Sequence, residues 1–197
     1  MIDLQELAFS EADHIYRLNG VIIPSVSKII EPVSNAAYGT INPVVLQNAA
    51  DRGTTVHKAI EDYNNYGIMD IEKNLSGYAD AYTNWYEMRM PEVEQCEVRI
   101  YHKVMRYGGT VDLLARIDGK LWLIDYKTSY KVVDKTYRLQ LEAYVQALAT
   151  LGVQVEEKMA LHLTRDSRFE EVFYPIKDAE AWRVFGACKS IYDYNNK

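Results

Sequence analysis

Two aspartates and a lysine lie on the two arms of a predicted β-hairpin. Asp112 ends the run Gly-Thr-Val-Asp, and Asp125 and Lys127 flank a tyrosine in the run Asp-Tyr-Lys-Thr. Between them, the Asp118-Gly119 dipeptide is a strong signal for a two-residue turn, and residues typical of strands fill both arms. The sequence therefore brings three chemically useful side chains onto neighbouring strands.

The register set by this turn places Asp112 opposite Asp125 and Thr110 opposite Lys127. Side chains directly opposite each other have Cβ atoms about 4.5–5.5 Å apart, and two carboxylates there repel unless a cation or a shared proton lies between them. Carboxylate oxygens bind Mg²⁺ or Mn²⁺, and a lysine beside such an ion can orient or help deprotonate an attacking water. The pattern predicts metal-assisted hydrolysis of a phosphate ester, with ordinary surface charges as the alternative.

The two runs, thirteen positions apart, resemble two motifs of the PD-(D/E)xK nuclease superfamily. Residues 52–61 read Arg-Gly-x-x-x-His-x-x-x-Glu, which is similar to a helix of the RecB-like exonuclease branch. Residues 140–144 read Gln-x-x-x-Tyr, which is similar to a motif that follows the catalytic lysine in that branch. Residues 23–27, Ile-Pro-Ser-Val-Ser, resemble a segment near the start of phage and mitochondrial members. The resemblance covers about residues 15–145.

This resemblance implies a fold and a set of functional residues. The fold would be an α/β, restriction-endonuclease-like core with a mixed central β-sheet flanked by helices. One or two Mg²⁺ or Mn²⁺ ions would be held by His57, Asp112, Asp125 and the backbone carbonyl of Tyr126. The predicted catalytic residues are Asp112, Asp125, Lys127 and Glu61, and the predicted nucleic-acid contacts are Arg52, Gln140, Tyr144 and Arg138.

Helical spacing agrees with part of this assignment. His57 and Glu61 stand four residues apart, so they share one face of a helix, and so do Gln140 and Tyr144. Two alternatives stay open, because Glu61 also fits an ordinary solvated acid and Tyr144 also fits the apolar stripe of a core helix. Glu97, on the strand before the hairpin, could join the site through a water, although an edge or surface glutamate is the favoured interpretation.

The resemblance favours a metal-dependent DNA exonuclease that acts on DNA that is single-stranded or has free ends, in phage or mobile-element DNA processing, recombination or repair. A structure-specific or restriction-type endonuclease would use the same core. A non-catalytic nucleic-acid-binding domain is a third interpretation, which the retained acids and lysine disfavour. A homo-oligomer or a recombination-protein partner remains open.

Length and composition predict one domain in the cytoplasm. The 197 residues are 48% apolar, without a break in composition, and divide into an N-terminal hairpin and helices (1–50), a catalytic core (51–150) and C-terminal strands and a helix (151–197). No apolar run or signal peptide is evident, so we expect no membrane contact and a cytoplasmic location, the host cytoplasm for a phage-encoded protein. Two cysteines, Cys96 and Cys188, are too few for the four-cysteine iron–sulfur cluster of some relatives, so no cluster is expected.

The net charge of −6 argues against broad electrostatic adhesion to DNA. A local basic track on both sides of the acids is the alternative, formed by Arg99, His102, Lys103, Arg106, Lys131, Lys135 and Arg138.

The predicted elements alternate between helices and strands. Expected strands are 14–18 and 21–24 in one hairpin, then 93–104, 110–117, 121–128, 157–164 and 169–174. Expected helices are 25–30 capped by Ser25, one opened by Asn42-Pro43, the His57 helix to about 66, 76–89, 136–150, and a last one capped by Asp178.

Overall fold

The computed structural model describes residues 7–11, 13–39, 42–129 and 134–196. Its centre is a five-stranded sheet in the order β4-β5-β6-β7-β8. The strands are β4 (Glu92–Tyr101), β5 (Gly108–Ile117), β6 (Lys120–Lys127), β7 (Glu157–Leu163) and β8 (Phe169–Tyr174). Only β6 and β7 run parallel among these strands, so the sheet is mixed, as predicted.

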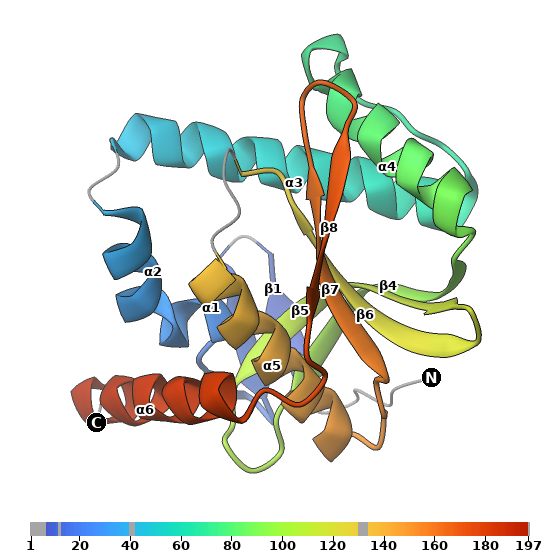
Figure 1. The fold of residues 1–197 in the computed structure, drawn as a ribbon. Helices are drawn as coiled ribbons and strands as arrows, with labels where there is room; N and C mark the ends of the chain where they lie inside the picture. The colour runs from blue at the N-terminus through green and yellow to red at the C-terminus, as the bar shows by residue number, and fades with distance from the viewer. Residues whose placement is uncertain (1–6, 12, 40–41, 130–133, 197) are drawn as a thin grey trace.

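Helices cover both faces of this sheet (Figure 1). One apolar cluster joins the sheet to α3 (Pro43–Tyr66) and α4 (Ser76–Arg89), and another joins it to α1 (Val26–Ile29), α5 (Asp134–Thr150) and α6 (Ala179–Asn195). A helix α2 (Glu31–Tyr38) and a short 3-10 turn η1 (Lys73–Leu75) complete the helical elements in the described part of the chain. The predicted mixed sheet flanked by helices is confirmed.

The β5–β6 hairpin forms as the sequence predicts. Asp118 and Gly119 both have positive φ angles, 53° and 78°, which a type I′ turn requires. The ladder runs from Ile117–Lys120 to Leu113–Ile124. It does not include the predicted pairs Asp112–Asp125 and Thr110–Lys127, because the arms part beyond Leu113 and the Asp112 carboxylate accepts a hydrogen bond from the Tyr126 amide instead.

A small three-stranded sheet lies beside the central one. It consists of β1 (Leu7–Ser10), β2 (Ile15–Leu18) and β3 (Val21–Ile23), of which β2 and β3 form the predicted hairpin. The sequence did not indicate β1 or α2. The β3 end connects to the central sheet, since Gly108 N donates to the Pro24 carbonyl at 2.9 Å.

Helix α3 is longer than predicted. Asn42 caps it by accepting from Val44 N at 2.9 Å, Pro43 occupies its first turn, and Gly67 ends it with a left-handed φ of 72°. The helix opened by Asn42-Pro43 and the helix that carries His57 are therefore one helix of 24 residues. Strand β4 ends at Tyr101, three residues before the predicted end.

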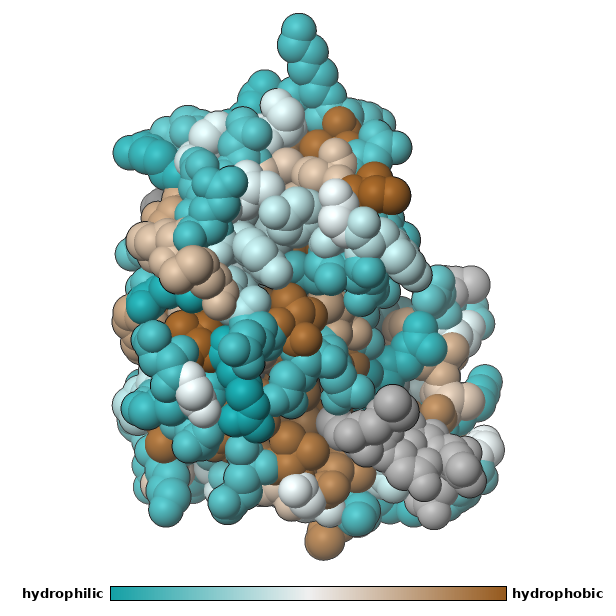
Figure 2. Space-filling view, turned by 90° about the vertical axis from the view of Figure 1, so that its right-hand side faces the viewer, coloured by the Kyte–Doolittle hydropathy of each residue, from teal (hydrophilic) through white to brown (hydrophobic). Residues whose placement is uncertain are grey.

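None of the described helices combines the length and the apolar character that crossing a bilayer requires. On the face shown in Figure 2, hydrophobic residues form small, separate patches among hydrophilic ones.

Candidate active site

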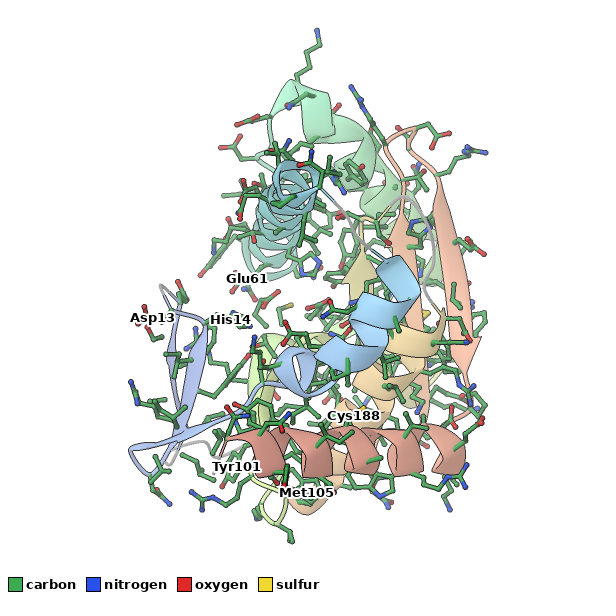
Figure 3. The ribbon with its side chains drawn as sticks, turned by 90° about the vertical axis from the view of Figure 1, so that its left-hand side faces the viewer. Asp13, His14, Glu61, Tyr101, Met105 and Cys188 are labelled. Atoms are coloured by element: carbon green, nitrogen blue, oxygen red, sulfur yellow. The ribbon has the colours of Figure 1, made fainter. Side chains whose placement is uncertain are left out.

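A cavity of about 560 Å³ opens where α3, the central sheet and the N-terminal sheet meet. Figure 3 shows it from the side on which Glu61 of α3 faces the β1–β2 turn that carries His14. Acidic, histidine, amide and tyrosine side chains line it: His57 and Glu61 from α3, Glu97 from β4, Asp112 from β5, and Gln140 and Tyr144 from α5. The fold thus gathers residues that are far apart in the sequence.

His57, Glu97 and Asp112 form a compact group in this cavity. One ligand atom from each of the three lies within 4.8 Å of the others. The His57 Nδ1 atom is 3.4 Å from Asp112 Oδ1 and 3.9 Å from Glu97 Oε1. The other ring nitrogen, Nε2, lies 3.2 Å from the backbone carbonyl oxygen of Tyr126. Imidazole and carboxylate donors so close together are suited to holding a divalent cation.

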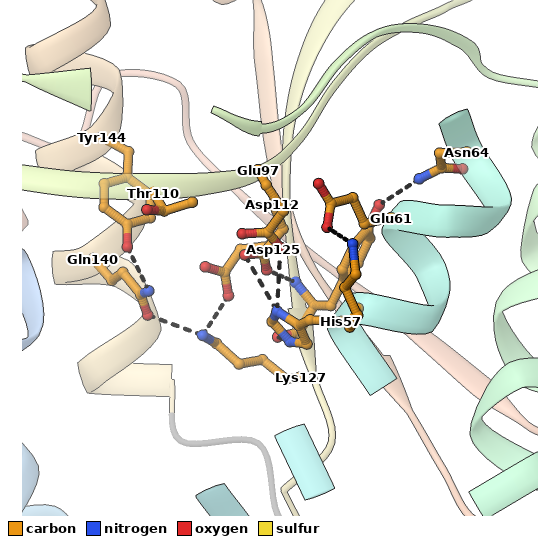
Figure 4. Close-up of polar contacts among 12 residues, drawn as sticks. His57, Glu61, Asn64, Glu97, Thr110, Asp112, Asp125, Lys127, Gln140 and Tyr144 are labelled. Atoms are coloured by element: carbon orange, nitrogen blue, oxygen red, sulfur yellow. Dashed lines mark hydrogen bonds and ion pairs between the residues drawn. The ribbon is translucent and has the colours of Figure 1, made fainter. Parts of the chain in front are cut away.

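Asp125 and Lys127 extend this group toward α5 (Figure 4). The Lys127 ammonium forms an ion pair with Asp125 and donates a hydrogen bond to Gln140 Oε1 at 3.0 Å. Gln140 in turn donates to the Tyr144 hydroxyl at 2.9 Å. Gln140 and Tyr144 therefore fix the position of the lysine in this structure, four residues apart on one face of α5, as their spacing predicts.

Burial and crowding change the ionisation of the three acids. Burial raises the pKa of Asp125 to about 6, against the opposing charge of Lys127. Burial together with the Asp112 carboxylate raises the pKa of Glu97 to about 7. Burial also opposes ionisation of Asp112, but His57 and Lys127 outweigh it and hold the pKa of Asp112 below its ordinary value. The ionised forms of Asp125 and Glu97 are therefore disfavoured on balance, and a bound cation would favour them.

The two basic groups are protonated at neutral pH. Burial disfavours the charged form of His57, yet the charge of Asp112 raises its pKa to about 9. Burial acts on Lys127 in the same way, and Asp125 and Asp112 raise its pKa above the ordinary value. Lys127 is therefore a cationic hydrogen-bond donor, which suits it to orient water and to stabilise negative charge on a phosphate.

The donor set fits the Mg²⁺ or Mn²⁺ that the resemblance implies. These ions prefer oxygen ligands, and His57 would supply one nitrogen once it loses its proton. Glu97 and Asp112 offer carboxylate oxygens, and Asp125 and the Tyr126 carbonyl lie next to the group. The predicted roles of His57 and Asp112 agree with this geometry, while Asp125 is engaged by Lys127.

Gly108 and Gly109 allow two aromatic rings to lie directly on the β5 backbone. A Cβ atom on Gly109 would be 2.4 Å from Cε1 of Tyr144, and one on Gly108 would be 2.7 Å from Cγ of Tyr16. Both distances are too short for any side chain. The packing of these two rings at the edge of the cavity therefore requires glycine at both positions before Thr110.

Glu61 lines the cavity but lies outside the compact group. Its carboxylate accepts a hydrogen bond from Lys58 at 3.0 Å, one turn away on the exposed side of α3. The structure therefore places Glu61 at the rim, and its predicted catalytic role stays a prediction.

Two predicted nucleic-acid contacts, Arg52 and Arg138, have structural partners within the protein. The guanidinium of Arg52 donates to the Thr128 carbonyl at 3.2 Å, which fastens the end of β6 to α3. Arg138 forms two hydrogen bonds to Asp178, the N-cap of α6, at 2.8 and 2.9 Å. Arg52 also lines a pocket of about 340 Å³ together with His57, Lys127 and Gln140, whereas Arg138 lies in neither this pocket nor the cavity. Both roles in nucleic-acid binding stay predictions.

The predicted basic track is not continuous. Arg99 lines the cavity and pairs with Glu11 at 3.1 Å. His102 is buried and stacks on Trp182 at 5.8 Å between ring centroids, so the expectation that it belongs to a basic surface is wrong. Lys103 and Arg106 follow in the β4–β5 loop, Lys135 lies at the start of α5, and Lys131 falls outside the described residues.

Glu97 is the candidate site residue that sequence reasoning undervalued. The β4–β5 register shifts by one residue between Val93 and Gln95, and Cys96 and Val98 then pair with the residues on either side of Asp112. Glu97 consequently lies opposite Asp112, with a φ of 48° that is unusual for a residue with a side chain. Such a strained backbone in a strand is found most often at functional sites.

Comparisons with known proteins show the family to which the chain belongs. The family model of the PD-(D/E)XK nuclease superfamily matches residues 66–185. Over 109 residues the chain is 31% identical to the mouse protein "Mitochondrial genome maintenance exonuclease 1", a match that covers 49% of this chain but about a third, 31%, of that relative.

Two solved structures are also similar. An alkaline exonuclease (LHK-Exo) from Laribacter hongkongensis aligns with a TM-score of 0.48 and 11% identity over 87% of this chain and 86% of that chain. LHK-Exo in complex with dAMP aligns with a TM-score of 0.49 and 15% identity over 88% of this chain and 87% of that chain. Because the family match covers more than half of its residues, this chain belongs to the PD-(D/E)XK nuclease superfamily.

Proposed function

We propose that the chain is a metal-dependent DNA exonuclease that hydrolyses phosphodiester bonds from free DNA ends. The observation that carries this proposal is the group of His57, Glu97 and Asp112 within 4.8 Å, with the Lys127–Asp125 pair beside it. Two ionised carboxylates at this separation repel each other when no cation is bound. A lysine held at the edge of such a group is suited to phosphoryl chemistry.

Each residue has a distinct part in this reaction. A bound Mg²⁺ or Mn²⁺ would supply positive charge for the phosphate oxygens and lower the pKa of a water. The carboxylates of Asp112 and Glu97 and the His57 ring would hold the ion. The Lys127 ammonium donates to the water or to a phosphate oxygen, and the Gln140–Tyr144 pair keeps that ammonium from turning away.

Action on free ends rests on similarity. The curated relative is named an exonuclease, and so is the similar structure from Laribacter hongkongensis. Beyond the activity itself, we propose a role in phage or mobile-element DNA processing, recombination or repair, in the host cytoplasm, alone or with a recombination partner.

The test is cleavage of end-labelled single-stranded, linear double-stranded and closed circular DNA with Mg²⁺ or Mn²⁺. We expect linear DNA to be degraded, circles to survive, and a chelator to stop the reaction. Cut circles would instead establish an endonuclease, and a protein that cuts nothing but binds DNA would be a binding domain.

The lysine assignment is tested in the same assay. Lys127→Met preserves the aliphatic stem, and we expect it to lower kcat at least about 100-fold. Lys120→Met is the matched control, because Lys120 lies on the same strand but its side chain is 55% exposed and paired with Glu157. A Lys127→Met protein as active as the Lys120→Met protein would refute the role of Lys127.

A further inference from the structure

We propose that Phe9, His14 and Arg99 form a wall of the cavity that stacks against an unpaired base of the DNA strand being cut. The proposal rests on the proposed function and specifies its substrate as DNA with at least one unpaired nucleotide at the site. All three side chains line the same cavity as His57 and Asp112. A base on this wall would therefore belong to the strand whose phosphate lies at the acids.

Phe9 contacts both His14 and Arg99, and the three side chains are called here the stacking wall. The rings of Phe9 and His14 meet edge to face with centroids 5.2 Å apart. The Arg99 guanidinium lies over the Phe9 ring, 5.0 Å from its centroid. His14 is exposed and Phe9 is half-buried, so the wall is accessible from the cavity. Figure 3 shows the turn with Asp13 and His14 facing Glu61 of α3 across the opening.

The stacking wall is attached to the catalytic strand. Behind it, Tyr16 is buried with its ring 4.6 Å from that of Phe9. The Tyr16 hydroxyl forms a hydrogen bond of 2.7 Å with Thr110 Oγ1. Thr110 and Asp112 are two residues apart on β5 and share one face of that strand. The N-terminal sheet is thus fixed in position relative to the acids.

The chemistry of the wall selects an unpaired base. Phenyl, imidazole and guanidinium planes all stack on nucleobases, and this contact tolerates any sequence. In a duplex, each base already stacks on its neighbours, so a wall of this kind gains contact area only from a terminal or unpaired base. Arg99 and Glu11 form an ion pair of 3.1 Å at the exposed edge of the wall.

The experiment uses oligonucleotides with 2-aminopurine, a fluorescent base that is quenched when it stacks. Binding is measured in the Lys127→Met protein with Mn²⁺, so that the strand stays intact. We expect 2-aminopurine to be quenched at one or two positions near a single-stranded end. We expect Phe9→Leu to remove this quenching and to weaken single-strand binding about 5- to 100-fold, the range for loss of one base stack.

Three further variants make the result specific. Phe9→Tyr keeps the ring and should keep the quenching. His14→Ala removes an exposed ring that contacts Phe9 and Tyr16 edge to face, and it should weaken single-strand binding and leave blunt duplex binding unchanged. Phe173→Leu is the matched control, because Phe173 is an aromatic residue 53% exposed on β8, outside the cavity lining, and it should behave as the parent protein.

Failure of this inference is separable from failure of the proposed function. If the wild-type protein cuts DNA while Phe9→Leu and His14→Ala match Phe173→Leu in quenching and affinity, the stacking wall is refuted alone. If the wild-type protein cuts no DNA with either metal, the proposed function is refuted and this inference with it.

Discussion

Replacing Glu97 with glutamine should stabilise the metal-free protein and weaken its response to metal. The pKa of Glu97 is raised from the ordinary 4.5 to about 7, chiefly by burial and then by Asp112. Below pH 4.5 the carboxyl is protonated in both the folded and the unfolded state and has no effect. Its destabilisation grows between pH 4.5 and 7 and is complete above pH 7, because ionisation is then harder in the folded state.

The difference between these two pKa values corresponds to about 3 kcal/mol, at about 1.4 kcal/mol per pKa unit. The Glu97 side chain is 31% exposed, so solvent screens part of this energy, and we expect a gain of about 1–2 kcal/mol at pH 8 for Glu97→Gln. In a chain of this size that gain corresponds to a rise in Tm of about 2–8 °C. At pH 5 the gain should nearly disappear.

The assay is thermal unfolding at pH 5 and pH 8, with a chelator or with Mn²⁺. With Mn²⁺ the wild type should melt at a higher temperature than Glu97→Gln, because the wild type gains more binding energy than a variant that has lost a ligand. Glu94→Gln is the control, since Glu94 lies on the same strand in an exposed ion pair with Arg116 and should change stability by at most about 1 kcal/mol. The reasoning is refuted if Glu97→Gln has a lower Tm than the wild type at pH 8 without metal. It is also refuted if Mn²⁺ raises the Tm of Glu97→Gln as much as it raises that of the wild type.

Three further outcomes are expected. Affinity for Mn²⁺ should rise from pH 6 to pH 9, because Asp125, Glu97 and His57, with pKa values of about 6, 7 and 9, lose their protons over this range. Calorimetry in buffers of different ionisation enthalpy would register this as proton release on binding. An affinity that does not change with pH would count against the participation of these three residues. Glu142→Gln should lower the free energy of unfolding by about 3–5 kcal/mol, because it leaves the buried Lys158 without its ion pair. The control is Glu157→Gln in the exposed Lys120–Glu157 pair, which should change that free energy by at most about 1 kcal/mol. Urea denaturation measures the free energy of unfolding of both variants. Gly109→Ala should displace the Tyr144 ring and reduce kcat more than it reduces stability, and unchanged turnover would show that the ring does not position Lys127 through Gln140.

Local signals predicted the hairpin and its neighbourhood well. The Asp118-Gly119 turn determined the β5–β6 register, because only residues that tolerate positive φ can form a type I′ turn. Helix spacing placed Gln140 and Tyr144 on one face, and the structure brings that face to Lys127. These predictions succeeded because each depends on residues close together in the chain.

Contacts between distant segments were not predictable in the same way. A one-residue bulge in β4 decides that Glu97, and not Cys96, lies opposite Asp112, and no pattern in the sequence locates that bulge. Arg138 was expected at DNA, yet its partner is the N-cap of α6 forty residues away. Strand β1 has four residues, too few for an alternating pattern to stand out.

Under the proposed function, the charges of the cavity predict that metal and DNA each increase the affinity for the other. Its lining holds more acids than bases, with Glu11, Glu61, Glu97 and Asp112 against Lys58, Arg99 and the protonated His57, and each of these bases is already paired with an acid. A phosphate that enters this cavity without a cation would meet net negative charge, on a protein whose overall charge is −6. A divalent ion reverses the local sign, so it should increase affinity for DNA, and by reciprocity DNA should increase affinity for the ion by the same factor. Cleavage would then be confined to strands whose backbone reaches the acids, while the proposed stacking wall would determine which nucleotide lies there.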